Sequence, residues 1–591
     1  MSAAPGRGAP ALYDLALRLA HEAPDGLPPE GGFRLDRARP PRPLPVNELR
    51  RIVAEVFAPG PEAGGPGSRL ERLAAARPAQ LATAVRELPL PPGPVGPTPA
   101  MARRLAREGT DPIAVTVGIA LLGRFGDAAD VPCLSALGLL RDLNGPAVQA
   151  LRGLDRRAAA FAVLAVRPRA APLRPLLLAL RSGERAAVRR ELVSMPVSPR
   201  ELSVASEIIG ATGLPALLAA HPDDPELLYR AALLLHAAAE PRGPVRPDDV
   251  PAPRELYERV AAGAAVLPPT LDHAALLLSV AQDLSSGTGA LPDWPPGRRA
   301  VLLDRLDRVS AAMGRAVLAG AGGEEQERRA RWIGRVGRRP FRLPDGPDGF
   351  RIEVVHGDPA ERGRVETRVL FDGRPVVPEL FGFGPAEDPA VLLDEGLLRA
   401  SAEPREVRLA TASCAEECCG ALYVTVRRDG DRVVWERWRR SCYRPGLLDV
   451  PARSFDARAY DAELARAEAD DSADWRARTV ARLLNRALRA RPELLHRWDA
   501  DLGRVGTCPD EPDTVDLTFW YVPGRHSGTP DRPDRPLAFR WLLPEDGFPP
   551  EAQAAAALHR LATERPTSWA RICAGSRERA EELGFTWPWP E

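Results

Sequence analysis

Apolar residues in the first part of the chain recur with the period of a helix. Leu12, Leu15 and Leu19 follow one another at i, i+3 and i+7, which predicts an amphipathic helix over residues 9–22. Further helical patterns follow, separated by linkers rich in proline and glycine, which interrupt helices. We therefore expect residues 1–99 to form a helical N-terminal segment with Pro/Gly-rich linkers.

From about residue 100 the apolar pattern repeats itself with a period of forty residues. The segment FGDAADVPCLSALGLLRDLNGPAVQAL (125–151) aligns with RPRAAPLRPLLLALRSGERAAVRRE (167–191). The first shift of forty pairs Pro132 with Pro172, Leu137 with Leu177, Leu140 with Leu180 and Val148 with Val188. A second shift pairs Pro175 with Pro215, Leu177 with Leu217, Leu178 with Leu218 and Val188 with Leu228. Each unit reads as a helix, a short turn and a second helix.

This repeat resembles the HEAT family of helical repeats. The resemblance is carried by the Gly126-Asp127 turn, Pro132 early in the next helix, the Leu137/Leu140 face and Val148 in the helix after it. It covers about 100–240 and, more loosely, 250–335. It implies an α-solenoid over 100–340, because helix pairs that are apolar on two sides bury both by stacking. The alternative is an irregular helical bundle in which the spacing arises by chance.

At about residue 349 the period changes from helical to alternating. Leu422, Val424 and Val426 alternate with polar residues, and an Asp-Gly turn signal follows, which together predict a β-hairpin. Similar strands are predicted at 350–356 and 365–373. We expect an antiparallel β-rich domain with a cysteine-rich turn at 349–446.

The remaining 447–591 contain both periods. Apolar residues at helical spacing predict helices at 456–470 and 473–490, and alternating stretches predict strands at 514–522 and 536–544. We expect an α+β C-terminal module packed on the sheet. The predicted fold class is therefore mixed, with an N-terminal α-solenoid of HEAT-like helical repeats followed by a C-terminal α+β module with an antiparallel sheet.

The charge pattern limits the chemistry. The formal net charge of the 591 residues is zero, which argues against a global polyanion binder, though not against a local basic patch. No lysine is present, so all 80 cationic side chains are arginine. Without lysine, Walker-type nucleotide hydrolysis, Schiff-base aldolase chemistry and pyridoxal enzymes are excluded. Asparagine, isoleucine and methionine are scarce too, which indicates a GC-rich bacterial genome more than selection against lysine modification.

The N-terminal sequence has no basic start followed by an apolar core, so we expect no signal peptide. No uncharged apolar run approaches the roughly 18 residues that a membrane-spanning helix needs. We therefore expect a cytoplasmic protein without membrane contact. Thiols there are held reduced, so clustered cysteines favour metal binding, redox activity or inert thiols over disulfides.

Four of the seven cysteines are close in sequence: Cys414, Cys418, Cys419 and, after the hairpin, Cys442. A structural Zn²⁺ takes four such ligands in a tetrahedron, and the hairpin could return Cys442 to the cluster. The spacing differs from a C-x2-C knuckle, and adjacent cysteines point apart in extended chain. Inert thiols, a zinc site and a redox role stay open, so the cofactor is either none or Zn²⁺.

The cysteine-rich turn is followed by the CGALYVTV strand, a second turn and the VVW strand. This order is similar to uncharacterised modules of GC-rich bacteria. No activity is assigned to those modules, so this resemblance implies no function.

Arginine and tryptophan occur together in two segments. Arg437, Arg439 and Arg440 flank Trp435 and Trp438, and residues 328–342 combine seven arginines with one tryptophan. Such groups suit phosphate contact with base stacking. Because every cation in this chain is arginine, a solvated face is the simpler interpretation, and we do not expect nucleic acid as a partner.

The histidines give little further. His21, His236, His273, His496 and His559 lie in predicted helices, where we expect packing or surface roles. His526 lies beside Ser527 in a loop, but sequence spacing identifies no carboxylate partner for it. No residue is assigned a catalytic role.

Three hypotheses follow. The first is a non-enzymatic cytosolic interaction or scaffold protein, whose helical-repeat surface binds an unidentified protein partner. The second is a metal-binding or thiol-dependent enzyme or sensor centred on the turn from Cys414 to Cys442. The third is a nucleic-acid-binding protein that uses the Arg/Trp segments.

Overall fold

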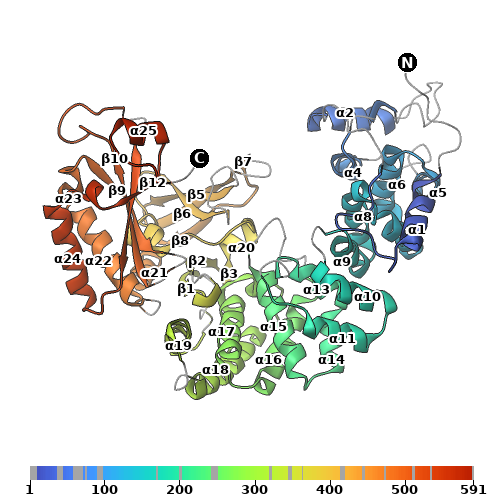
Figure 1. The fold of residues 1–591 in the computed structure, drawn as a ribbon, viewed down its shortest axis with the longest axis horizontal. Coiled ribbons are helices and arrows are strands. Elements are labelled where there is room, and N and C mark those ends of the chain that lie inside the picture. Colours follow the sequence, from blue (N-terminus) through green and yellow to red (C-terminus); the bar gives the residue numbers. More distant parts are fainter. Residues whose placement is uncertain are drawn as a thin grey trace. The chain divides into compact units, whose positions relative to one another are not determined.

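The structure is a computed structural model in which the chain divides into two compact units. Unit 1 comprises residues 1–238 and 248–266, and unit 2 comprises residues 239–247 and 267–591 (Figure 1). The described residues are 10–35, 44–57, 71–73, 76–89, 98–167, 171–198, 202–240, 250–317, 322–341, 343, 349–361, 364–412, 420–441, 446–471, 474–508, 511, 513–532 and 535–588.

Unit 1 is built from helices. Its α-helices are α1 (Leu12–Glu22), α2 (Val46–Phe57), α4 (Pro78–Glu87), α5 (Pro99–Glu108), α6 (Pro112–Phe125), α7 (Val131–Leu137), α8 (Arg141–Leu154), α9 (Arg156–Ala165), α10 (Arg174–Ser182), α11 (Arg185–Ser194), α13 (Ala205–Thr212), α14 (Leu214–Ala220), α15 (Pro225–Ala239) and α16 (Pro253–Gly263). Short 3-10 helices η1 (Glu71–Leu73), η2 (Ala128–Asp130), η3 (Ala171–Leu173) and η5 (Ala264–Val266) join them.

Local chemistry explains where these helices start. Thr98, Asp111 and Asp155 cap α5, α6 and α9 by accepting hydrogen bonds from first-turn backbone amides. Helix α6 is apolar on all sides, so it lies in the middle of the core and packs against α4, α5 and α8. Helices α7, α10 and α14 each carry a proline in the first turn, where its missing amide costs nothing.

Unit 2 combines helices with three antiparallel sheets. Its helices are α17 (Leu271–Ser286), α18 (Arg298–Val317), α19 (Glu324–Val336), α20 (Val376–Leu380), α21 (Ala457–Ala469), α22 (Arg476–Ala490), α23 (Glu493–His496), α24 (Pro550–Thr563) and α25 (Arg577–Glu582). The 3-10 helices are η6 (Thr288–Ala290), η7 (Pro359–Glu361) and η10 (Pro566–Ser568), and η8 (Ala390–Asp394) is a π-helix.

The strands follow the alternation seen in the sequence. They are β1 (Phe350–His356), β2 (Val365–Phe371), β3 (Arg374–Pro375), β4 (Arg405–Thr411), β5 (Ala421–Asp429), β6 (Arg432–Arg440), β7 (Gly446–Leu447), β8 (Arg453–Asp456), β9 (Ala500–Thr507), β10 (Thr514–Tyr521), β11 (Leu537–Pro544) and β12 (Arg571–Ala574). The sheet orders are β1-β2-β3, β4-β5-β6-β7 with β8 also on β6, and β12-β11-β10-β9. The prediction of a helical first part and antiparallel sheets later in the chain is confirmed.

Two hydrophobic cores lie against the sheets of unit 2. The sheets β1–β3 and β4–β8 share one core with α21, in which Trp435, Trp438 and Tyr460 are almost completely buried. The sheet β9–β12 has its own core under α22 and α24, which lie side by side in Figure 1. Among the described residues no helix combines the length and the apolar character that a membrane crossing requires.

The sheet of β4–β8 has short chain segments on both outer sides. Strand β6 pairs with β5 on one side, and on the other with β8 along its first half and with β7 at its end. On the far side of the sheet, Ala386 bridges to Ala410 of β4, and the Glu387 amide donates to the Leu409 carbonyl at 2.9 Å.

Candidate functional site

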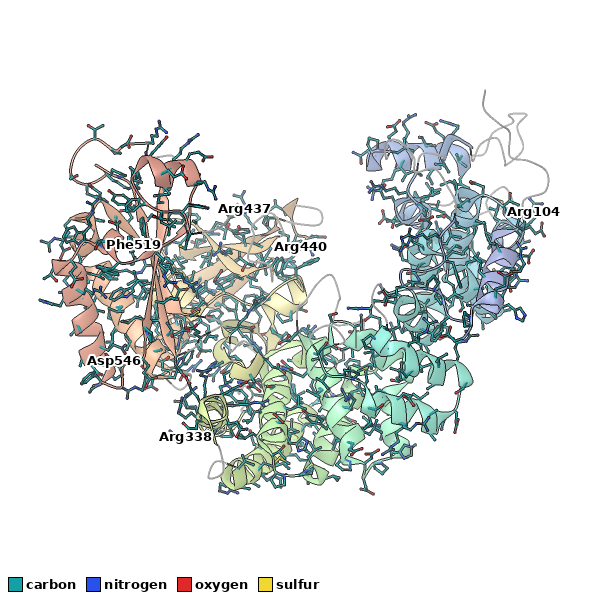
Figure 2. All side chains as sticks on the ribbon, in the orientation of Figure 1. Arg104, Arg338, Arg437, Arg440, Phe519 and Asp546 are labelled. Atoms are coloured by element: carbon teal, nitrogen blue, oxygen red, sulfur yellow. The ribbon has the colours of Figure 1, made fainter. Side chains whose placement is uncertain are left out.

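A cavity of about 740 Å³ lies in unit 2 between α19, the start of α22, the connection from β9 to β10, and the end of β11. These elements are far apart in sequence and are brought together by the core under α22. The cavity is lined by Glu324, Arg328, Arg331, Arg335, Asp474, Trp475, Arg476, Thr479, Glu511, Asp513, Thr514, Pro544, Glu545, Gly547 and Pro550. Figure 2 labels Arg338, just beyond α19, and Asp546, between two of the lining residues.

Helix α19 supplies three arginines to this cavity because they recur at i, i+3 and i+7 on one face. Arg328 donates to Asp513 at 2.8 Å, and this hydrogen bond raises the pKa of the guanidinium. Arg331 lies 3.7 Å from the same carboxylate. Arg335 forms no ion pair with any residue that the structure describes, and is thus the lining arginine left available to a ligand.

Arg335 lies over the ring of Trp475, with its guanidinium carbon 5.8 Å from the ring centroid. Its Nε atom is buried and has no hydrogen-bond partner among the described residues. Burial lowers the pKa of the Arg335 guanidinium, although Asp513 opposes the shift. An arginine keeps its charge at neutral pH even so, which leaves an incompletely solvated cation beside the cavity.

The start of α22 adds a second electropositive feature. Its N-cap residue, Trp475, offers no side-chain hydrogen bond to the first turn, and the first turn contains no acidic residue. The preceding Asp474 accepts hydrogen bonds from Arg478 and Arg482, at 2.7 and 2.6 Å, so its charge is already compensated. The amides and the partial positive charge of this helix end therefore remain uncompensated by a cap.

A buried histidine lies on the same tryptophan. The His356 ring stacks on Trp475 at 4.3 Å between centroids and 17° between planes. It is 3% exposed, and neither ring nitrogen has a partner among the described residues. Burial, with the positive charges of Arg335 and Arg478, lowers the pKa of His356 to about 3. The imidazole is thus neutral at pH 7.

The predicted zinc ligands Cys414, Cys418, Cys419 and Cys442 lie outside the described residues. Two described residues near these cysteines in sequence, Ala421 and Ser441, contact each other. The Ser441 amide donates to the Ala421 carbonyl at 3.1 Å, and the Ser441 hydroxyl accepts from the Ala421 amide. The zinc hypothesis for these cysteines remains a prediction.

The tryptophans of the two Arg/Trp segments point into the cores. Trp332 and Trp435 are 0% exposed and Trp438 is 1% exposed, so none can stack on a base. A β-bulge explains the second pair: Val424 of β5 faces two residues of β6, Arg437 and Trp438, because the register shifts there. Arg437 takes a φ of +54°, and Trp438 turns to the same side as Trp435. Figure 2 labels Arg437 and Arg440 on this strand.

The sequence pattern favoured a solvated face for Arg335 and did not indicate Trp475 and Asp513 as its neighbours. Trp475 and Asp513 are each more than 130 residues from Arg335 in sequence, and no local pattern predicts contacts at that separation. His526, the loop histidine without an identified partner, does have one: its Nε2 lies 2.9 Å from Asp501 Oδ1.

Comparisons with protein-family models, with curated proteins and with solved structures find no match to this chain.

Proposed function

We propose that unit 2 binds a small molecule bearing one anionic group, a phosphate or a carboxylate, in the cavity between α19 and α22. The observation that carries this proposal is the Arg335 guanidinium, which has no ion-pair partner among the described residues, beside the uncapped start of α22. Helix N-termini bind such anions through free amides and the helix dipole, and a guanidinium matches the same groups with paired N–H donors.

The other lining residues restrict the kind of ligand. The volume of about 740 Å³ lies within the roughly 300–1,000 Å³ of small-molecule sites. Glu511, Asp513 and Glu545 also line the cavity, and they would repel a polyanion such as nucleic acid. Pro544 and Pro550 in the lining offer apolar surface for the uncharged part of the ligand. A compact molecule with a single anionic end therefore suits this lining best.

The test uses the full chain with inorganic phosphate and acetate as probes, against chloride at equal ionic strength. Titration calorimetry should detect binding of the anion. Bound anion should also raise the midpoint of thermal unfolding, because a ligand at 100 times its Kd stabilises the folded state by about 2.7 kcal/mol. Arg335→Gln should abolish this effect. Arg338→Gln is the matched control, since Arg338 is exposed and lies outside the lining. Binding by the Arg335→Gln protein at wild-type affinity would refute the proposal.

A second function is favoured by unit 1. Its helices α7, α10 and α14 recur at about forty-residue intervals, and α9 packs against α13. This supports the HEAT-like solenoid and, with it, a protein-binding scaffold. Such repeats bind their partners on extended concave surfaces.

The scaffold proposal predicts a protein partner that depends on the exposed apolar side chains of unit 1. Leu178 on α10 is 40% exposed, and Leu447 of unit 2 is 66% exposed. Leu178→Glu in the full chain should remove a partner recovered from cell extract, while Leu447→Glu should retain it. Recovery that is equal for both variants, or absent from the wild type, would contradict the proposal.

A further inference from the structure

Two histidines and an aspartate converge where β9 begins and β10 ends. His496 is the last residue of α23, Asp501 is the second residue of β9, and His526 lies in the loop after β10. Antiparallel pairing of β9 with β10 brings the three together, with Asp501 opposite Trp520. One ligand atom from each residue lies within 4.8 Å of the other two.

The separations match those of metal ligands. Asp501 Oδ1 is 2.9 Å from His526 Nε2 and 3.6 Å from His496 Nε2. Tetrahedral Zn²⁺ with bonds of about 2.0–2.1 Å sets its ligand atoms roughly 3.3 Å apart. The two imidazole rings stack at 3.9 Å with 12° between planes. Because the rings are nearly parallel, binding one ion requires each exposed ring to rotate until the two Nε2 lone pairs converge on it.

The backbone around these ligands is fixed by Asp499. This residue takes a φ of +55°, and its carboxylate accepts hydrogen bonds from the Gly524, His526 and Ser527 amides at 2.9–3.0 Å. The Ser527 hydroxyl donates to it as well, at 2.8 Å. The loop carrying His526 is thereby held against the start of β9. Such outer partners orient metal ligands and determine the affinity of the site.

The helix end that carries His496 is also held in place. The Trp498 indole donates to the Leu561 carbonyl of α24 at 2.7 Å, and Leu495 is buried, which holds α23 in place. Arg525 Nε lies 2.5 Å from Asp501 Oδ2, so this oxygen is occupied and Oδ1 is the one directed at the histidines. The cluster is thus built from a helix end, a strand and a loop that are each held independently.

We propose that His496, Asp501 and His526 bind one divalent transition-metal ion of the zinc class. Two imidazoles and a carboxylate are ligands that suit Zn²⁺, Co²⁺ and Ni²⁺. The three side chains are 26–38% exposed, so water reaches the remaining coordination positions. This site is independent of the anion cavity described above and shares no residue with it.

The test is Zn²⁺ titration of the metal-free full chain, with Co²⁺ as the spectroscopic probe. We expect one ion whose Kd rises by about 100-fold or more in His496→Gln or His526→Gln, and by about 10–100-fold in Asp499→Asn, which only positions the loop. His559→Gln is the control, because His559 is exposed on α24, outside the cluster. Circular dichroism would show that each variant is folded.

The Co²⁺ spectrum distinguishes this site from the cysteines. A histidine and carboxylate site gives visible ligand-field bands without the intense near-ultraviolet bands of thiolate ligands. Cys418→Ser should leave the spectrum and the Kd unchanged. Thiolate bands that disappear in Cys418→Ser, or binding that survives His496→Gln and His526→Gln together, would overturn the proposal.

Discussion

The stability of unit 2 should fall at mildly acidic pH because of one side chain. His356 has a pKa of about 3 in the folded protein, against 6.5 for an unperturbed histidine, chiefly because it is buried. Between these values the unfolded chain binds a proton that the folded chain does not. Acid therefore favours unfolding in this window, and stability rises with pH until about 6.5.

The size of the effect follows from the two pKa values. At pH 4.5 the unfolded histidine is almost fully protonated and the folded one is almost fully neutral. Between pH 7 and pH 4.5 the free energy of unfolding should fall by about 2.5 kcal/mol from His356 alone. His356→Phe keeps a flat ring against Trp475 and has nothing to protonate. Its free energy of unfolding should lack this component and depend less steeply on pH.

Denaturant unfolding followed by tryptophan fluorescence is a suitable assay. The first of the eleven tryptophans is Trp294, so this signal reports unit 2 alone. His559→Phe, an exposed histidine, controls for the general loss of imidazole. If wild type and His356→Phe lose equal stability between pH 7 and pH 4.5, His356 is not buried as a neutral group and the reasoning is wrong.

Three further substitutions test other parts of the structure. Burial raises the pKa of Asp307 to about 6, so the folded state loses stability as pH rises through 3.8 to 6. Asp307→Asn should then be more stable than wild type by about 1 kcal/mol at pH 8, after discounting for partial exposure, and equal to it below pH 4 in urea unfolding. A Cβ on Gly384 would lie 1.8 Å from the Thr411 carbonyl oxygen, so Gly384→Ala should cost about 2 kcal/mol in the same assay. Asp130 accepts two hydrogen bonds from Arg103, and Asp130→Ala should cost about 2 kcal/mol in thermal unfolding followed by circular dichroism. A change below about 0.5 kcal/mol in either of the last two variants would contradict the packing described.

The sequence predicted those parts of the fold that depend on local period. Leu422, Val424 and Val426 alternate with polar residues, and the structure buries these three on β5. A strand with one buried face must show this pattern, so the hairpin could be predicted. Trp438 could not be placed, because the bulge that turns it inward depends on how β5 and β6 pair.

The candidate sites were less predictable, for a related reason. Arg328 and Asp513 are separated by 185 residues, and Asp501 and His526 by 25. Sequence spacing reports neighbours along one helix or one strand, whereas these pairs meet only when sheets and helices have packed. His526 could be selected as a polar loop residue, but its carboxylate partner follows from the pairing of β9 with β10.

The covering of the β4–β8 sheet has a consequence for behaviour at high concentration. Unpaired strand edges are templates on which another chain can add a strand and begin to aggregate. Here β7 and β8 take up much of the free side of β6, and the segment at Ala386 covers part of β4. The residues left open include charged Arg405 and Arg437, both exposed. Edge-to-edge association through β4 and β6 is therefore disfavoured, although the core of this sheet contains the large aromatic side chains of Trp435, Trp438 and Tyr460.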